Sequence, residues 1–160
     1  MKGSSKVVSA LQMLIDNELA ARDQYFVHAQ KYKDMGLNIL HERLYHEMQE
    51  ETEHAQQMVD RMLFLEGTPN LNNRADVNMG SDVEEMLKND LEMEYKTVNN
   101  LKSVIKICES EDDFDTRDIL VKQLDDSEMD HTYFLEKQIG LISKIGLQNY
   151  IQSQIGIEPK

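Results

Sequence analysis

The chain has 160 residues with 30 acidic and 17 basic side chains, which gives a formal net charge of −13. This charge argues against nucleic acid and anionic membrane surfaces as main partners and favours attraction of cations, although acids that only keep a surface soluble would give the same balance. A single cysteine, Cys108, excludes an intramolecular disulfide and a cysteine-based zinc site. Since we find no signal peptide, transit peptide or membrane-spanning apolar run, we expect a cytoplasmic protein with no membrane partner.

Helices meet few breakers in this sequence, which has two prolines, seven glycines and no clear run of alternating β-branched residues. We therefore expect one all-α domain over residues 1–160. The first predicted helix covers about residues 6–35 and ends at Gly36, a natural helix stop. Glu18 falls within its buried apolar stripe, and Tyr25 lies two turns further along the same face.

The second predicted helix runs from about residue 37 to residue 65, antiparallel to the first because the connection is short. Apolar residues recur along it at the spacing of a buried face, but this spacing places Glu47, Glu51 and His54 where leucine would be expected. A buried carboxylate without a partner is very costly, so some group should compensate it. Glu51 and His54 also form a Glu-x-x-His pair, which puts two ligand side chains about one turn apart on one helix face.

Residues 67–80 contain one proline, four asparagines and no helical periodicity. The helix before them is about 43 Å long, and an extended segment of this length spans at most about 46–50 Å. The loop is therefore just long enough to run back along the whole bundle. This predicts a third helix that is parallel to the second.

The third predicted helix begins at a capping-box pattern formed by Ser81 and Glu84. Its apolar stripe continues to about Cys108, which we interpret as a small core residue. Glu94 interrupts this stripe.

The fourth predicted helix follows an acidic turn at residues 109–115 and runs to about Ser143. Glu128 and His131, a second Glu-x-x-His pair, interrupt its apolar stripe. Residues 146–155 form a short amphipathic segment, which is too short to be a fifth member of the bundle.

Each of the four helices thus carries polar groups in an apolar stripe, and counting residues from the two turns places all six groups at one level of the bundle. They are Glu18, Glu51, His54, Glu94, Glu128 and His131. A single such group is more often a hydrogen-bonded core residue, but four carboxylates packed together repel one another severely unless cations balance them. One Glu from each of two helices and Glu-x-x-His from the other two is the di-iron carboxylate pattern. Oxygen and imidazole ligands without a thiolate suit iron or manganese.

The sequence also resembles the bacterioferritin family over almost its whole length. The matching runs are NELA with QYF near residues 17–26, LFLEG with PNL at residues 63–71, DVEEML at residues 82–87 and GLQNY at residues 146–150. The resemblance implies a ferritin-like four-helix bundle with one long crossover and a short C-terminal fifth helix. It also implies a large hollow homo-oligomeric shell that takes up Fe(II), oxidises it with dioxygen or peroxide, and stores ferric mineral.

The resemblance further implies a role for each group. Glu51 and Glu128 would bridge two irons in each subunit. Glu18 with His54 would complete the ligands of one iron, and Glu94 with His131 those of the other, which are the pairs that the level argument also gives.

Other polar residues receive weaker assignments. Tyr25 is a candidate electron donor to the irons, with a packed tyrosine as the alternative. His46 and Glu50 would form a secondary iron site by resemblance, with an ordinary surface pair as the alternative. His28 and His41 are expected at the surface.

One departure from the family concerns haem b, which the family binds between two subunits through a Met from each. That Met should follow the bridging Glu of the second helix, but Thr52 follows Glu51 here. The nearest alternative, Met48, is displaced by about 6 Å along the helix. We therefore expect the homomeric shell to bind haem weakly or not at all.

Two rival functions stay open at this point. The chain could be a storage or structural subunit that co-assembles with a haem-binding sister chain. It could also be a di-iron oxidase that acts on an organic substrate. The native mass discriminates a large shell from a monomeric or dimeric oxidase.

Overall fold

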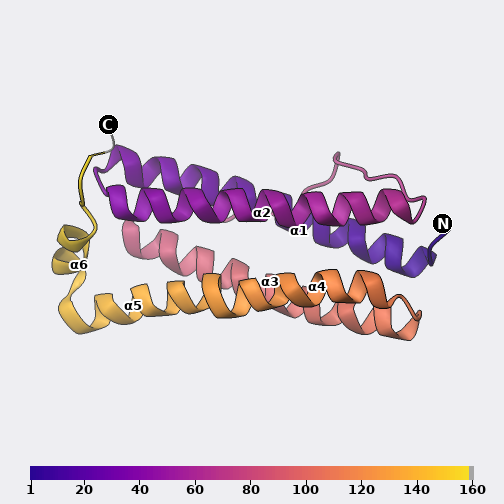
Figure 1. Ribbon diagram of the computed structural model, residues 1–160. Coiled ribbons are helices and arrows are strands. Elements are labelled where there is room, and N and C mark those ends of the chain that lie inside the picture. The colour runs from indigo at the N-terminus through magenta and orange to yellow at the C-terminus, as the bar shows by residue number, and fades with distance from the viewer. Residues whose placement is uncertain (159–160) are drawn as a thin grey trace.

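Long helices lie side by side in the computed structural model, which describes residues 1–158 (Figure 1). Helix α1 spans Ser5–Asp34 and α2 spans Asn38–Phe64, antiparallel to it. Helix α3 spans Val83–Ser110. The turn between α1 and α2 contains Gly36 at a φ of 78°, where the N–H of Leu37 donates to the carbonyl of Tyr32 over 2.9 Å. Gly36 therefore ends the first helix as predicted, because glycine adopts this left-handed conformation without a steric penalty.

The fourth member of the bundle is built from three consecutive pieces. Helix α4 spans Phe114–Asp126, the π-helical turn η1 spans Ser127–Thr132, and α5 spans Tyr133–Ile145. A short helix, α6, spans Leu147–Ser153 and lies across one end of the bundle (Figure 1). The predicted all-α class, the four-helix bundle and the short C-terminal helix are confirmed. No helix within residues 1–158 has the length and apolar character needed to cross a membrane.

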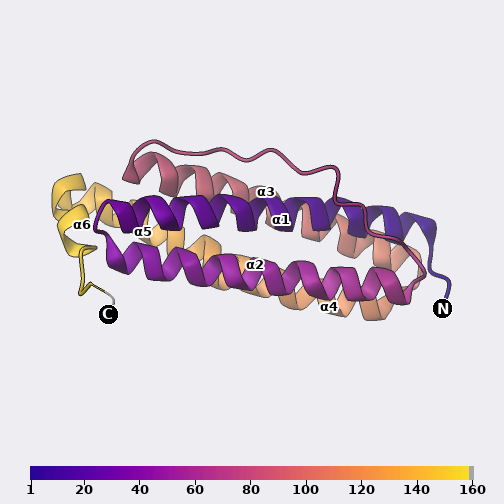
Figure 2. The same cartoon turned by 90° about the horizontal axis from the view of Figure 1, so that it is seen from above.

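The crossover between α2 and α3 runs along the length of the bundle, so α3 is parallel to α2 as the loop length predicted (Figure 2). Side chains of α1 hold it in place. Gln12 exchanges two hydrogen bonds of 2.8 Å with the backbone of Asn70, and Gln24 accepts from the N–H of Asn78 over 2.9 Å. His28 Nε2 accepts from the N–H of Gly80 over 3.0 Å. The expected surface position of His28 is therefore wrong, because the crossover covers it completely.

The start of α3 lies one residue beyond the predicted capping box. Asp82 is the N-cap, and its carboxylate accepts from the N–H of Glu85 over 2.9 Å. The Glu85 carboxylate accepts in turn from the N–H of Ser81 over 2.7 Å. Asp82 and Glu85 therefore form the cap, one residue further along the chain than the predicted Ser81 and Glu84.

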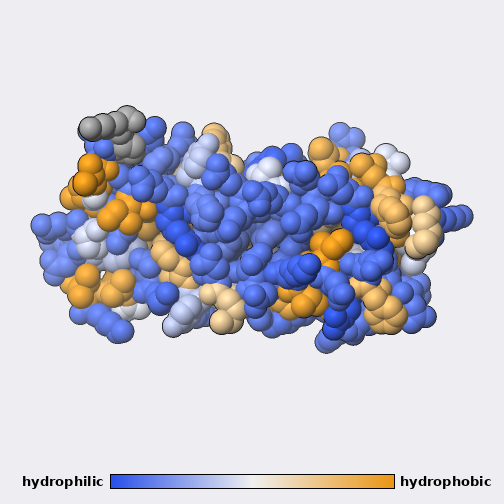
Figure 3. All heavy atoms as spheres, in the orientation of Figure 1, coloured by the Kyte–Doolittle hydropathy of each residue, from blue (hydrophilic) through white to orange (hydrophobic). Residues whose placement is uncertain are grey.

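The buried apolar side chains form two clusters, one toward each end of the bundle. The first joins the start of α1 to the ends of α2 and α3 and includes Leu11, Leu14, Met58, Leu101 and Cys108. The second joins the end of α1 to the start of α2 and α3 and includes Tyr32, Leu40, Leu44, Leu87 and Leu135. On the face shown in Figure 3 the middle of the molecule is mostly hydrophilic, and hydrophobic patches lie toward the ends. The level between the two clusters is left to polar groups.

Cys108 should be inert in the folded protein. It is fully buried in the first cluster, and burial raises the pKa of its thiol to about 11. The thiolate is the reactive form, so at mildly alkaline pH we expect Ellman's reagent to react at least about tenfold more slowly with the native protein than with protein unfolded in guanidinium. Equal rates in the two states would show that this end of the core opens readily.

Candidate metal centre

Five of the six predicted groups meet between the two apolar clusters. They come from all four members of the bundle: Glu18 from α1, Glu51 and His54 from α2, Glu94 from α3, and His131 from η1. None of these side chains belongs to a residue more than 5 % exposed. The helices therefore place a compact set of carboxylates and imidazoles in a dry interior.

The five residues form two groups that share one carboxylate. In the first group, His54 Nδ1 lies 3.7 Å from Glu18 Oε2 and 3.4 Å from Glu51 Oε2. In the second, His131 Nδ1 lies 3.0 Å from Glu51 Oε1 and 3.3 Å from Glu94 Oε1. Each oxygen of Glu51 thus faces a different group, and the two imidazole rings are stacked with centroids 6.1 Å apart. This is the geometry expected of a carboxylate that lies between two cation positions.

Several buried oxygens in these groups accept no hydrogen bond. They are both carboxylate oxygens of Glu18, both of Glu51, and Oε2 of Glu94. Buried polar atoms in folded proteins nearly always have a hydrogen-bond partner. Five unsatisfied acceptors at one place therefore indicate that a partner of another kind binds there. Carboxylate oxygens and imidazole nitrogens with free lone pairs are suitable ligands for divalent iron or manganese.

The electrostatics of the metal-free centre show the same demand for positive charge. Burial, reinforced by Glu51, raises the pKa of Glu18 well above its ordinary value, and burial also raises the pKa of Glu94. Burial alone would lower the pKa of His54, but the Glu18 and Glu51 carboxylates raise it to about 11. Protons therefore balance the carboxylates when metal is absent, and a metal ion must displace them to bind.

Tyr25 touches the second group. Its hydroxyl donates a short hydrogen bond to Glu94 Oε1, and its ring meets the His131 ring edge-on at a centroid distance of 6.4 Å. Burial, reinforced by Glu94, raises the pKa of the Tyr25 hydroxyl well above its usual range. The hydroxyl is therefore protonated and fixes the orientation of the Glu94 carboxylate.

Glu128 is the sixth predicted group, and the structure does not bring it to the other five. It lies on η1, its side chain is 40 % exposed, and its carboxylate forms an ion pair with Lys102 of α3. A π-helical turn contains more residues than an α-helical one, so residues three apart no longer share a face. The Glu-x-x-His spacing that works in α2 for Glu51 and His54 therefore separates Glu128 from His131.

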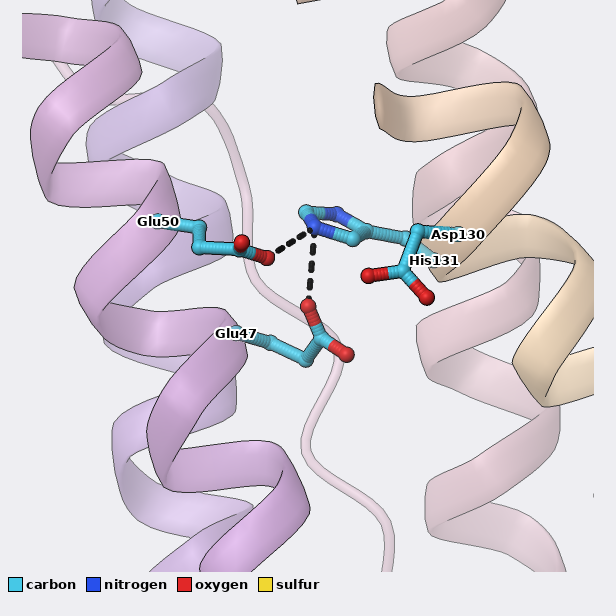
Figure 4. Close-up of side chains that lie close together, drawn as sticks. All are labelled: Glu47, Glu50, Asp130 and His131. Carbon is cyan, nitrogen blue, oxygen red and sulfur yellow. Dashed lines mark hydrogen bonds and ion pairs between the residues drawn. The ribbon is translucent and has the colours of Figure 1, made fainter. Parts of the chain in front are cut away.

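Glu47 approaches His131 instead (Figure 4). No metal-binding role was predicted for Glu47 from the sequence. Its Oε2 lies 2.8 Å from His131 Nε2, and Glu50 Oε2 lies 2.9 Å from the same nitrogen. Asp130 completes a group of four possible ligands around this side of the imidazole. Arg43 supplies a positive charge here, since its guanidinium contacts Glu47 and lies 2.7 Å from Asp130 Oδ1. The position of Glu47 in the apolar stripe of the second helix was the available signal.

The remaining predicted residues lie on the outside of α2. His46 Nε2 is 3.3 Å from Glu50 Oε1, and its side chain is 56 % exposed. The hydrogen bond from His131 lowers the pKa of Glu50 to about 2, so Glu50 is ionised. Thr52 is exposed and donates to the backbone carbonyl of Met48 over 2.9 Å.

The sequence is similar to known ferritins over almost its whole length. A family model described as a ferritin-like domain matches residues 8–145. A bacterial ferritin from Synechocystis sp. is 52 % identical over 155 residues, which cover 97 % of this chain and 99 % of the relative. A bacterial ferritin from Pseudomonas aeruginosa is 50 % identical over 155 residues, which cover 97 % of this chain and 100 % of the relative. A bacterioferritin from Brucella melitensis is 35 % identical over 152 residues, which cover 95 % of this chain and 94 % of the relative. The resemblance that the sequence motifs suggested is confirmed.

The displacement of protons by metal gives a pH-dependent prediction. Because the folded-state pKa of His54 is about 11, its ion pairs stabilise the metal-free protein fully below the ordinary value of about 6.5, and this stability is lost as pH rises toward the folded value. Proton competition with metal weakens over the same range. We therefore expect the increase in melting temperature caused by a fixed Zn(II) concentration to grow between about pH 6 and about pH 8.

Thermal unfolding with and without Zn(II) at several pH values measures this effect. His41→Gln is the control, since it changes an imidazole that contacts the Ala29 carbonyl rather than the centre. A zinc-induced shift that is the same at every pH, or that is absent, would contradict the assignment.

Proposed function

Since this chain belongs to the ferritin-like family, we propose that it stores iron and acts as a ferroxidase, oxidising Fe(II) to Fe(III) at the mid-bundle centre and depositing ferric mineral within a hollow oligomeric shell. The observation that carries the proposal is the position of Glu51, whose two oxygens face two separate Glu and His groups. Two iron ions are the substrate, and dioxygen or peroxide accepts their electrons. The native mass tests the shell against a monomeric or dimeric oxidase.

In this proposal Glu18 and His54 hold one iron, and Glu94 and His131 hold the other. Glu51 lies between them and keeps the two ions close enough to react together. Four hard carboxylate ligands favour Fe(III) over Fe(II), which helps to drive the oxidation. Glu128 is the proposed second bridging ligand, which requires its carboxylate to leave Lys102.

Tyr25 has two roles under this proposal. Its hydroxyl orients Glu94 through their hydrogen bond. The same contact, together with the edge-on His131 ring, supports its role as an electron donor to the centre.

We also propose that His46 and Glu50 contribute to a secondary iron site. Glu50 contacts both His46 and the outer nitrogen of His131, so a cation bound there would be one imidazole away from the centre. Glu47 and Asp130 extend this group, and Arg43 already neutralises part of it.

The proposed shell requires surfaces that other copies of the chain cover. Large apolar side chains such as Phe26, Leu63 and Phe64 are about half exposed in the single chain. Side chains of this kind are enriched in contacts between subunits. A mixed shell with a haem-binding sister chain would use the same contacts.

Loss of single ligands tests the ferroxidase. We expect Glu18→Ala and His131→Ala each to abolish the fast phase of Fe(II) oxidation, which should amount to about two irons per subunit in the parent. Glu53→Ala is the control, because Glu53 lies on α2 directly before the ligand His54 but is exposed. Stopped-flow absorbance of the ferric product gives the rates, and size exclusion verifies assembly. Parent rates in both ligand variants would remove the centre as the oxidation site.

The haem prediction concerns Thr52. Its hydroxyl is a poor ligand for ferrous haem and is already bonded to the Met48 carbonyl. We expect the homomeric parent to show no bis-Met haem spectrum after reconstitution, and Thr52→Met to gain one. The Soret and visible absorption bands provide the measurement. A stoichiometric bis-Met haem in the parent would mean that another methionine serves as the ligand.

A further inference from the structure

A pocket of 390 Å³ opens between α3 and the segment formed by η1 and α5. Its rim carries Lys102 and Glu128, which form an ion pair with side chains 49 % and 40 % exposed. The salt bridge therefore stands in solvent. It joins a residue with no assigned role to the one predicted ligand that lies outside the centre.

Two residues that line this pocket are close in sequence to the proposed metal ligands. Val98 lies one turn beyond Glu94 on α3, and Thr132 directly follows His131. The hydroxyls of Ser127 and Thr132, at the two ends of η1, are buried and have no hydrogen-bond partner. The turn that carries Glu128 is thus incompletely satisfied on its inner side. Glu128 is the residue of this turn whose carboxylate lies at the pocket, and it forms an ion pair with Lys102 there.

We propose that Lys102 is a positioning residue that holds the Glu128 carboxylate at the pocket rim until metal enters, and so controls the completion of the centre. This inference rests on the proposed function, in which Glu128 is the sixth ligand. A carboxylate cannot pair with Lys102 and bind a metal ion inside the bundle at once. Metal binding and the ion pair therefore compete for Glu128.

The strength of the ion pair suits such a role. A half-exposed salt bridge shifts an equilibrium by a few-fold at most, and salt weakens it further. The pair is therefore strong enough to set the resting position of Glu128, yet divalent ions displace it easily. A fully buried pair would have closed the centre to metal.

The simplest rival explanation is general electrostatics, because any lysine near the centre would repel a cation. The two explanations separate in a double-mutant cycle with Glu128. If Lys102 acts through Glu128, its effect vanishes when Glu128 is replaced. If Lys102 acts directly on the metal, its effect persists.

The experiment titrates Zn(II) into the metal-free assembled protein by calorimetry. The proteins are the parent, Lys102→Gln, Glu128→Gln, the double variant Lys102→Gln/Glu128→Gln, and Lys102→Arg. Lys106→Gln is the matched control, since Lys106 is exposed one turn further along α3 and forms no ion pair within the described chain. Size exclusion verifies that each variant assembles.

We expect Lys102→Gln to bind Zn(II) about two- to fivefold more tightly than the parent, with Lys102→Arg and Lys106→Gln unchanged. Glu128→Gln should bind both ions more weakly, because Glu128 is the proposed second bridge between them, and the double variant should match it. The ratio of the Zn(II) affinity of Lys102→Gln to that of the parent should fall toward one as the salt concentration rises, because salt screens the ion pair in the parent.

Three results would overturn the proposal: no change in Lys102→Gln, the same gain in Lys106→Gln, or a gain that persists in the Glu128→Gln background. Parent-like binding by Glu128→Gln would also reject it, because Glu128 would then not be a ligand. The first three results leave the proposed function unchanged, and the fourth removes only Glu128 from the proposed ligand set. The ferroxidase proposal itself fails only if Glu18→Ala and His131→Ala keep the fast phase.

Discussion

The structure depends on one costly arrangement, the burial of carboxylates at the middle of an apolar bundle. Within residues 1–158, the cationic partners of Glu18, Glu51 and Glu94 are imidazoles, and no lysine or arginine reaches these three carboxylates. Isolated buried charges of this kind are too expensive to keep, so protons or metal ions must accompany them. When no metal is bound, protons fill this role, because burial raises the pKa of Glu18 and the Glu18 and Glu51 carboxylates raise the pKa of His54.

The rest of the bundle keeps four helices in register around this level. The long crossover allows α3 to run parallel to α2, which sets Glu94 opposite Glu51. A buried network one turn away fixes the register: Asp90 Oδ1 accepts from Gln24 Nε2 over 2.8 Å and lies 2.8 Å from His28 Nδ1. Since His28 and Gln24 also hold the crossover, the same side chains align α1, α3 and the loop that joins the two halves.

The sequence predicted those parts of the centre that follow regular helical spacing. Glu51 and His54 meet because α2 is an unbroken α-helix at that point, and loop length alone was enough to orient α3. The outward position of Glu128 was not predicted, because the same spacing does not hold in a π-helical turn, and no pattern in residues 127–132 indicates such a turn. His28 was misplaced for a different reason, since the crossover that buries it is a tertiary contact that helical periodicity does not report.

The π-helical turn also explains why Arg43 and Lys102, two basic residues outside the centre, form ion pairs with the acidic residues that precede His131 in this turn. Asp130 points toward α2, where Arg43 binds it, and Glu128 points toward α3, where Lys102 binds it. His131 follows in the same turn, so the residue that contacts Glu47, Glu51 and Glu94 is carried by a segment tied to both neighbouring helices. In an α-helical turn Glu128 and His131 would share a face, and both would point into the centre. The π turn instead keeps the imidazole inside and leaves the two flanking acids at the surface, where exposed ion pairs hold them weakly enough to be exchanged.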